Sequence, residues 1–297
     1  MIDGHPLIIS MTTIPSRLIN IDTTIISILS QSVSPDEIVI TLPLESNRES
    51  KIGDPYVIPD FIEQLRTNSN NIKITILRCD KDHGPITKLL PCLKREKEKH
   101  LDKKEEALII TIDDDKIYDK NTLKYMIDGW RRNPKCVIAR KGSILKKVNK
   151  GSDNYRKNKA MWDKRGCIFE KVIIGFRLKQ DVSISVVFGT SCVLYRPSHF
   201  KMDFFNFKIK KGGPSFFFVD DIFISGYLGL KRVVKKAIMF PPTRFISKMI
   251  VAQKNNVNLN IDMNNKNRVV NPLININSSD ITNSVECVNY FKKHLVL

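Results

Sequence analysis

The feature that most constrains the fold of this 297-residue chain is an alternation of short apolar runs with segments of helical periodicity. The clearest run, 107–112, has the length and the β-branched content of a buried strand. Strands are also expected at 7–11, 38–40, 72–77, 136–139, 184–188, 192–195 and 233–240, and helices at 20–31, 59–66, 85–100, 121–132 and 219–230. This alternation predicts an α/β fold with a mostly parallel central sheet flanked by helices.

Composition places the chain among globular proteins, with 42% hydrophobic and 27% charged residues. We expect a single domain with its core at about 7–240 and a tail, 241–297, that is loop over 253–283 and helix over 285–294. No apolar run approaches the roughly 18 residues of a membrane span. The apolar stretch from Leu7 is too short for a signal peptide, so we expect a cytoplasmic protein.

Six cysteines stand at positions 79, 92, 136, 167, 192 and 287, and none has the close spacing of a zinc or redox motif. They are expected to be buried thiols in a reducing compartment.

Positive charge is concentrated in one part of the chain. The net charge is +18, and the segment 140–179 holds thirteen Lys or Arg against three acids. Such a segment is either a solvated insertion or a surface for nucleic acid, an anionic membrane or a phosphate-rich substrate. Its basic residues show little regular interleaving with aromatics, so nucleic acid is the less favoured partner.

Three adjacent carboxylates, Asp113, Asp114 and Asp115, follow the 107–112 strand directly. Adjacent carboxylates repel one another, and a hard divalent cation removes that cost. Because residues alternate in direction at the end of a strand, the first and third carboxylates can approach one ion. The alternative is a solvated turn that caps a helix. Capping candidates are already present at Asn121 and Thr122, so metal binding is favoured.

Two further polar clusters follow predicted strands. Positions 82–88 place Gly before Pro at the start of a helix, where backbone amides attract anions, and Lys88 is in reach of a phosphate. Positions 12–17 offer the hydroxyl of Thr12 and the guanidinium of Arg17, which suits phosphate, although an ordinary polar loop is an equal alternative. Parallel sheets bind ligands at the carboxyl ends of their strands, so these clusters are expected to meet.

A tandem acidic pair, Asp220 and Asp221, opens the predicted helix at 219–230. Acids at a helix N-terminus are favourable through the helix dipole, and that is the structural alternative. The functional interpretation is a general base that deprotonates an acceptor hydroxyl.

Together these motifs resemble the GT-A type glycosyltransferases, in particular family 2-like enzymes encoded by large DNA viruses. The resemblance is carried by TTIPSR (12–17), DHGPITKLLP (82–91), ALIITIDDD (107–115), FGTSCVLYRP (188–197) and FVDDIFISGYL (218–228), in that order, over about residues 7–240. It implies a GT-A (Rossmann-like) fold and metal-dependent sugar transfer from a nucleotide-sugar donor to a glycan or other hydroxyl acceptor. A UDP-sugar is favoured over a GDP-sugar. If the chain is viral, host cytoplasm or the virion is the expected location.

The resemblance also implies residue roles. Asp113 and Asp115 would bind Mn²⁺ or Mg²⁺ and the donor diphosphate, with Asp114 between them. The remaining donor-binding positions would be Thr12, Arg17, Lys88, Gly189 and Thr190, and the catalytic pair would be Asp220 and Asp221 with Asp221 as the base. Many family members supply a late His to the metal. Here only His199 and His294 are available, and neither lies in a recognisable motif.

Three other functions remain open from the sequence. A nucleotidyl or phosphoryl transferase would also use clustered carboxylates and metal, although no Walker-type loop is present. A non-catalytic nucleic-acid-binding protein would account for the charge. A transferase-like fold that has lost activity is the third. The stereochemical course, the oligomeric state and the identity of the sugar do not follow from the sequence.

Overall fold

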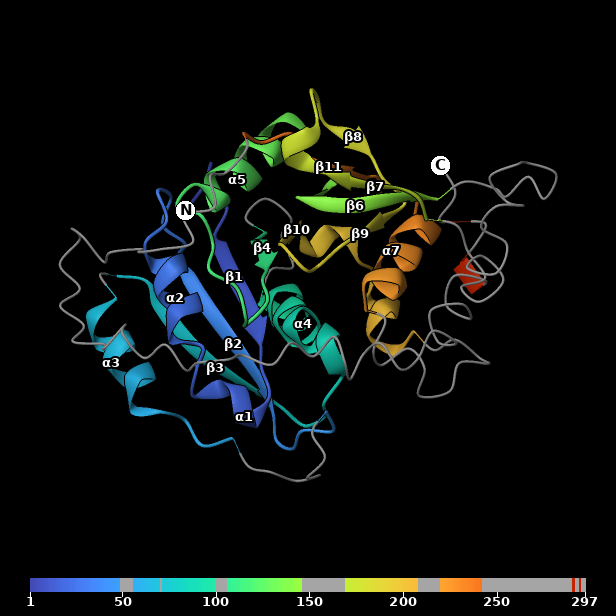
Figure 1. Ribbon diagram of the computed structural model, residues 1–297. Coiled ribbons are helices and arrows are strands. Elements are labelled where there is room, and N and C mark those ends of the chain that lie inside the picture. The colour runs from blue at the N-terminus through green and yellow to red at the C-terminus, as the bar shows by residue number, and fades with distance from the viewer. Residues whose placement is uncertain are drawn as a thin grey trace, which may run out of the picture.

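A mostly parallel eight-stranded sheet forms the centre of the computed structural model (Figure 1). The structure describes residues 1–48, 56–69, 71–99, 106–145, 169–207, 220–241, 290, 291 and 294. The predicted loop at 253–283 and the middle of the basic segment lie outside these residues. Of the predicted helix at 285–294, the structure describes residues 290, 291 and 294 alone.

The strands of the large sheet are β1 (Leu7–Thr12), β2 (Glu37–Pro43), β3 (Lys73–Cys79), β4 (Leu108–Thr111), β5 (Val137–Ala139), β8 (Val182–Ser183), β10 (Val193–Tyr195) and β11 (Lys235–Ala237). The α-helices are α1 (Pro15–Leu18), α2 (Asp22–Leu29), α3 (Asp60–Asn68), α4 (Leu90–Lys99), α5 (Thr122–Arg132) and α7 (Asp220–Leu230). Short 3₁₀ turns are η1 (Gly84–Lys88), η3 (Gly175–Arg177), η4 (Pro197–His199) and η5 (Met202–Asn206). The expected α/β class is confirmed.

Strand order in the large sheet is β3-β2-β1-β4-β10-β5-β11-β8. The pairs β3–β2, β2–β1, β1–β4 and β5–β11 are parallel, whereas β10 is antiparallel to both of its neighbours and β8 is antiparallel to β11. The parallel strands therefore define two edges of the sheet. We call them the carboxyl edge, where β1 and β4 end, and the amino edge, where β4, β5 and β11 begin.

Both faces of the sheet are buried, which explains why the strands read as nearly continuous apolar runs. In β1, Leu7, Ile9 and Met11 pack into one core cluster with α2, α3 and α5, and Ile8 packs into the other with α4 and α7. The amphipathic stripe of α5 lays Leu123, Met126, Ile127 and Trp130 into the first cluster.

The structure corrects the expected organisation after Arg140. The ends of the basic segment are not a loose insertion: β6 (Lys141–Leu145) and β7 (Phe169–Ile174) pair with each other and with β9 (Val186–Val187) in a second, antiparallel sheet. The strand expected at 184–188 is confirmed in part, because β9 lies inside this range. β8, which ends immediately before this range, was not predicted and belongs to the other sheet. A run of apolar residues indicates that a strand is buried, but it does not indicate which strand pairs with it.

The helix expected over 85–100 begins as the 3₁₀ turn η1 and continues as α4. In the part of the chain that the structure describes, no helix is both long and apolar enough to cross a bilayer.

Candidate functional site

Lys88 occupies the centre of the carboxyl edge and is held there by local structure. The turn η1 opens at Gly84, whose φ of +70° is disfavoured for residues with a side chain. Asp82 accepts hydrogen bonds from the Gly84 amide at 2.8 Å and from the Thr87 hydroxyl at 3.4 Å. Ser10 in β1 donates to the Lys88 carbonyl at 2.5 Å, which fixes the end of the turn against the sheet.

Carboxylates from distant parts of the chain surround the Lys88 ammonium. Its Nζ lies 3.1 Å from Asp113 Oδ1 and 3.5 Å from Asp220 Oδ2, and the Lys88 residue is only 8% exposed. Burial lowers the pKa of Lys88, but the negative charges of Asp113, Asp220 and Asp221 outweigh that effect and hold it well above its ordinary value. Lys88 is therefore charged and joins two of the predicted motifs.

Gly189 closes the other side of the lysine. Its amide donates to Asp221 Oδ1 at 2.9 Å. A Cβ at position 189 would meet Asp221 Oδ1 at 2.8 Å and Lys88 Nζ at 2.9 Å, so a larger residue here would displace these two side-chain ends. The loop after β9, the N-terminus of α7 and the turn η1 thus meet at one point.

The two acids of α7 have different surroundings. Asp220 is 9% exposed, and its Oδ2 accepts no hydrogen bond within the described residues, although Lys88 is close to it. Asp221 is partly exposed. Burial, and then the charge of Asp220, raise the pKa of Asp221 to about 8 against the opposing effect of Lys88. A carboxyl group with such a pKa exchanges protons near neutral pH.

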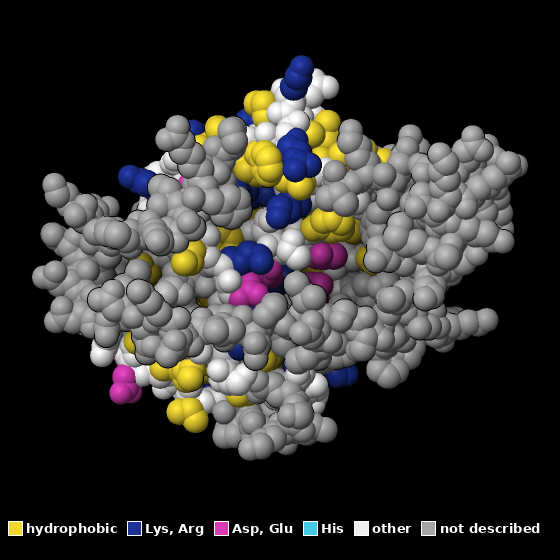
Figure 2. Space-filling model, in the orientation of Figure 1, with side chains coloured by type: hydrophobic (Ala, Val, Ile, Leu, Met, Phe, Trp, Pro, Cys, Tyr) yellow, Lys and Arg dark blue, Asp and Glu magenta, His cyan; other side chains and the backbone are white. Residues whose placement is uncertain are grey.

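The acidic triplet alternates in direction, as the sequence predicts. The carboxylates of Asp113 and Asp115 are 22% and 23% exposed, whereas that of Asp114 is 8% exposed. Thr13 donates to Asp114 Oδ2 at 2.5 Å, and Thr24 donates to the Asp114 carbonyl at 2.9 Å. The middle carboxylate therefore anchors the turn, and the outer two face the site. Acidic and basic side chains lie side by side near the centre of the face in Figure 2.

Arg17 lies against the triplet. Its Nη2 is 2.8 Å from Asp114 Oδ1 and 3.2 Å from Asp115 Oδ2, and its side chain is 9% exposed. Burial raises the pKa of Asp114, and the charge of Arg17 opposes that rise. Lys116 is 3.6 Å from the other oxygen of Asp115. Arg17 thus contacts carboxylates of its own chain, where a direct contact with phosphate was expected.

Arg48 is a central residue that no sequence pattern marks. It is 6% exposed and bridges two of the predicted clusters. Its Nε lies 3.2 Å from Asp82 Oδ2, and its Nη2 donates to Thr12 Oγ1 at 3.4 Å and to the Thr13 carbonyl at 3.1 Å. Thr12, a predicted donor-binding residue, is buried at this bridge with 7% exposure.

Tyr118 is a second such residue. Its hydroxyl accepts from the Asp113 amide at 2.9 Å, and its own amide donates to Ser27. It fixes the backbone at the first residue of the triplet. A tyrosine in an otherwise polar loop carries no pattern that would mark this role in the sequence.

The remaining predicted residues are placed less centrally. Thr190 is exposed in the turn beside Gly189. His199 lies in η4, which follows antiparallel β10 and therefore stands at the amino edge, away from Asp113. His294 lies beside Gly229, near the C-terminal end of α7, whereas Asp220 begins that helix. The structure brings neither histidine to the triplet.

No set of three His, Cys, Asp or Glu side chains converges as a metal site among the residues for which the structure gives positions. The four cysteines that it describes, 79, 92, 136 and 192, are free thiols. Cys92 and Cys192 are buried, and burial raises the pKa of each to about 12.

Among known proteins, the chain is matched by solved structures and by no family model or curated protein. Among solved structures it is similar to S. aureus TarS 1–349, with 13% identity and a TM-score of 0.41 over 76% of this chain, and to the same protein in complex with UDP-GlcNAc, with 15% identity and a TM-score of 0.43 over 83%. The complex of TarS with UDP has 14% identity and a TM-score of 0.41 over 76% of this chain. The matches cover only 62% to 65% of the TarS chains. Likeness at this level does not carry an argument about activity.

Proposed function

We propose that the chain is a metal-dependent glycosyltransferase that moves a sugar from a nucleotide-sugar donor, with a UDP-sugar favoured, to a hydroxyl acceptor. The observation that carries the proposal is the meeting of Lys88, Asp113, Gly189 and the Asp220–Asp221 pair at the carboxyl edge of a mostly parallel sheet. Ligands of such sheets bind at this edge. The GT-A type, the viral relationship and the site roles belong to this proposal.

The residues present fit a divalent cation. Asp113 and Asp115 are the exposed carboxylates of the triplet, and they flank a buried one. Mg²⁺ is commonly bound by one or two carboxylates together with substrate phosphates, so a third protein ligand is not required. When bound, Mn²⁺ or Mg²⁺ would neutralise charge on the donor diphosphate. Asp113 and Asp115 would hold the cation, and Asp114, through Thr13 and Arg17, would hold the turn that carries them.

In the proposed reaction the acceptor hydroxyl oxygen forms a bond to the anomeric carbon, and the bond from that carbon to the diphosphate oxygen breaks. The nucleoside diphosphate leaves with the bonding electrons. The hydroxyl proton passes to Asp221, which is the more exposed acid of the pair and has a pKa near the pH at which proton transfer is most effective. Lys88 remains charged beside Asp113, where it would stabilise negative charge on the leaving group.

Thermal unfolding with UDP, GDP, CMP and dTDP, each with and without Mn²⁺, tests the donor site, because a ligand that binds only the folded chain raises the melting temperature. We expect one nucleotide to act only with metal. Asp115→Ala should abolish that shift, and Glu98→Ala, which removes an exposed carboxylate of α4, should keep it. A metal-independent shift, or an equal response in Asp115→Ala, contradicts the proposed metal site.

Product analysis separates sugar transfer from nucleotidyl transfer. With a UDP-sugar and an acceptor, release of UDP supports the proposal, whereas release of pyrophosphate from a nucleoside triphosphate supports the rival enzyme class. DNA binding that weakens steeply with salt, without turnover, would favour the nucleic-acid-binding alternative.

A further inference from the structure

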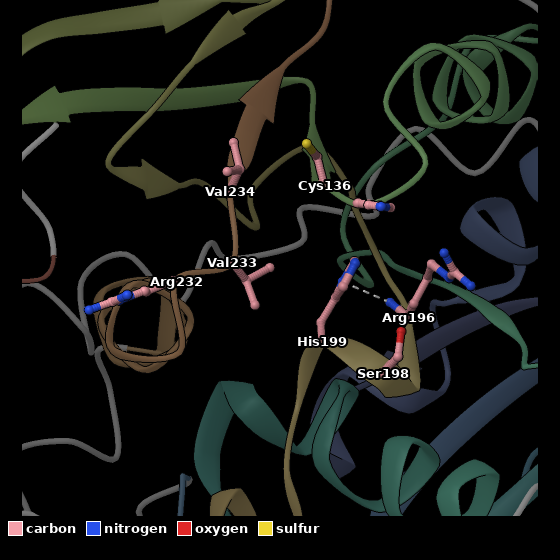
Figure 3. A pocket seen from close by; sticks show the side chains of 8 residues that line it. Cys136, Arg196, Ser198, His199, Arg232, Val233 and Val234 are labelled. Atoms are coloured by element: carbon pink, nitrogen blue, oxygen red, sulfur yellow. Dashed lines mark hydrogen bonds between the residues drawn. The ribbon is translucent and has the colours of Figure 1, made fainter. Parts of the chain in front are cut away.

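A second concave site lies at the amino edge of the sheet, where none of the proposed catalytic residues is found. It is a cavity of about 420 Å³ (Figure 3). Cys136 and Val234 line it just before β5 and β11, and Arg196 and His199 line it just after β10. A volume of this size is in the range that binds small molecules.

His199 presents a hydrogen-bond donor without an acceptor. The Arg196 amide donates to its Nδ1 at 3.1 Å, and because an amide can only donate, Nδ1 is the acceptor nitrogen of the ring. Burial lowers the pKa of His199 to about 3, so the ring is neutral and its proton is on Nε2. His199 is 6% exposed, and Nε2 has no partner within the described part of the chain. Figure 3 shows this second nitrogen turned to the space between Val233 and Cys136.

Arg196 contributes a second donor of the same kind. Its guanidinium is ion-paired with Glu106 through Nη2 and donates to the Pro134 carbonyl at 2.8 Å through Nη1, but its buried Nε has no acceptor among the described residues. Glu106 also accepts hydrogen bonds from Ser198. The Ser198 amide donates to Oε2 at 2.7 Å, and its hydroxyl donates to Oε1 at 2.8 Å. A buried donor without an acceptor is unfavourable, so these two donors on residues that line the cavity indicate a missing acceptor.

The rim of the cavity is basic. Lys135 lines it, is exposed and forms no ion pair with a described acid. Arg232 is also exposed, but its side chain points away from His199 in Figure 3. The wall between them includes Val233 and Val234 and is apolar. The cavity therefore combines buried donors that find no acceptor among the described residues, one cation at its rim and an apolar wall.

We propose that this cavity binds a small molecule that carries a phosphate group. A phosphate presents three acceptor oxygens and a charge near −2, which suits the Lys135 cation and the N–H donors better than a neutral ligand would. The apolar wall accommodates the organic part of the ligand. The site is separate from the proposed donor site, since it lies at the opposite edge of the sheet.

Phenyl phosphate is a suitable probe, with inorganic phosphate and phenol as its two halves. NMR of the histidine side chains in the full-length protein reports the location, because Nε2–H of His199 is expected to shift on binding. We expect phenyl phosphate to bind at least tenfold more tightly than phenol. It should still shift the His199 signal in the presence of about 1 mM UDP with Mg²⁺, which would occupy the proposed donor site. Binding that leaves the His199 signal unchanged overturns the proposal, since the probe then occupies another site.

Two variants test the contacts. Lys135→Glu reverses an exposed charge and should weaken phenyl phosphate binding about fivefold or more, whereas Lys94→Glu, an equally exposed change on α4, should not. His199→Phe keeps the ring and removes the donor, and it should also weaken binding. If His199→Phe unfolds the protein, Lys135→Glu still decides: equal affinity in Lys135→Glu and Lys94→Glu contradicts a phosphate site.

Discussion

The two edges of the large sheet differ in the sign of the groups that lack partners. At the carboxyl edge, Asp113, Asp220 and Asp221 surround one buried ammonium, that of Lys88. At the amino edge, Arg196 and His199 present donors that find no acceptor among the described residues. One edge thus has carboxylates in excess and the other has donors in excess. A cation would therefore complement the charge of the carboxyl edge, and an anion would complement the donors of the amino edge.

The largest effect is expected from Lys88→Met, which removes the only cation that lies among the three carboxylates described at that point. Breaking a buried ion pair leaves uncompensated charge, so we expect the free energy of unfolding to fall by about 3–5 kcal/mol at pH 7. Urea unfolding measures this. Lys94→Met, which removes an exposed lysine of α4, should change stability by less than about 0.5 kcal/mol.

A second substitution sharpens that result. Asp220→Asn in the Lys88→Met background removes one of the repelling charges and should recover part of the stability, but not the sugar transfer. If Lys88→Met is as stable as the natural chain, the carboxylates are not held by this lysine, and the contrast between the two edges fails.

Arg48→Met is expected to have the next largest effect, about 3 kcal/mol, because it leaves the Asp82 carboxylate buried without its guanidinium. It also releases Thr12 and the Thr13 carbonyl from their shared donor. The matched control is Arg78→Met, in which an exposed arginine near the end of β3 is removed. A similar loss of stability in both variants would mean that the Arg48 bridge contributes nothing specific.

Arg48 also shows which part of the candidate site could not be predicted from the sequence. Lys88, the triplet and the Asp220–Asp221 pair were found because each stands directly after a strand or at the start of a helix, and a parallel sheet brings such positions to one edge. Arg48 stands in a polar stretch with no periodicity, and its partner Asp82 is 34 residues away. Nothing local specifies that pairing, because it depends on how β1, β2 and β3 are stacked.

The same limit applies to strand direction. The run at 192–195 predicts a strand, and β10 is present. A short apolar run does not indicate whether its strand is parallel or antiparallel to its neighbours. Only the register, with Val193 opposite Thr111 and Tyr195 opposite Ile109, shows that β10 is antiparallel to β4. That reversal takes η4 and His199 to the amino edge, and it could not be predicted from residue types.

Gly189→Ala should have a smaller effect on stability and a clear effect on catalysis. The new Cβ would lie 2.8 Å from Asp221 Oδ1 and 2.9 Å from Lys88 Nζ, so the carboxylate must move. A displaced catalytic group costs about 10²-fold in rate. We expect kcat for sugar transfer to fall by that factor with the melting temperature little changed. Ser191→Ala, two residues along the same turn, is the control. Equal activity in the two variants would separate Gly189 from the site.

The smallest effect per pH unit is a pH dependence of stability to which the two edges contribute with opposite signs. The Asp221 carboxyl titrates near 3.8 when exposed and near 8 in the folded chain, so between these values the folded chain holds a proton that the unfolded chain has lost. The Asp221 contribution to stability therefore falls as pH rises from about 4 to 8, by up to about 1.4 kcal/mol per pH unit. The His199 contribution rises with pH up to about 6.5, because the unfolded ring is protonated below that pH and the folded ring is not, so the net fall is expected above about pH 6.5. Asp221→Asn should remove the fall above pH 6.5 in urea unfolding. His199→Phe should instead steepen the fall below pH 6.5 and leave the slope above it unchanged, because the unfolded histidine is neutral there. An unchanged slope in Asp221→Asn would assign the titration to another group and remove the main support for Asp221 as the base.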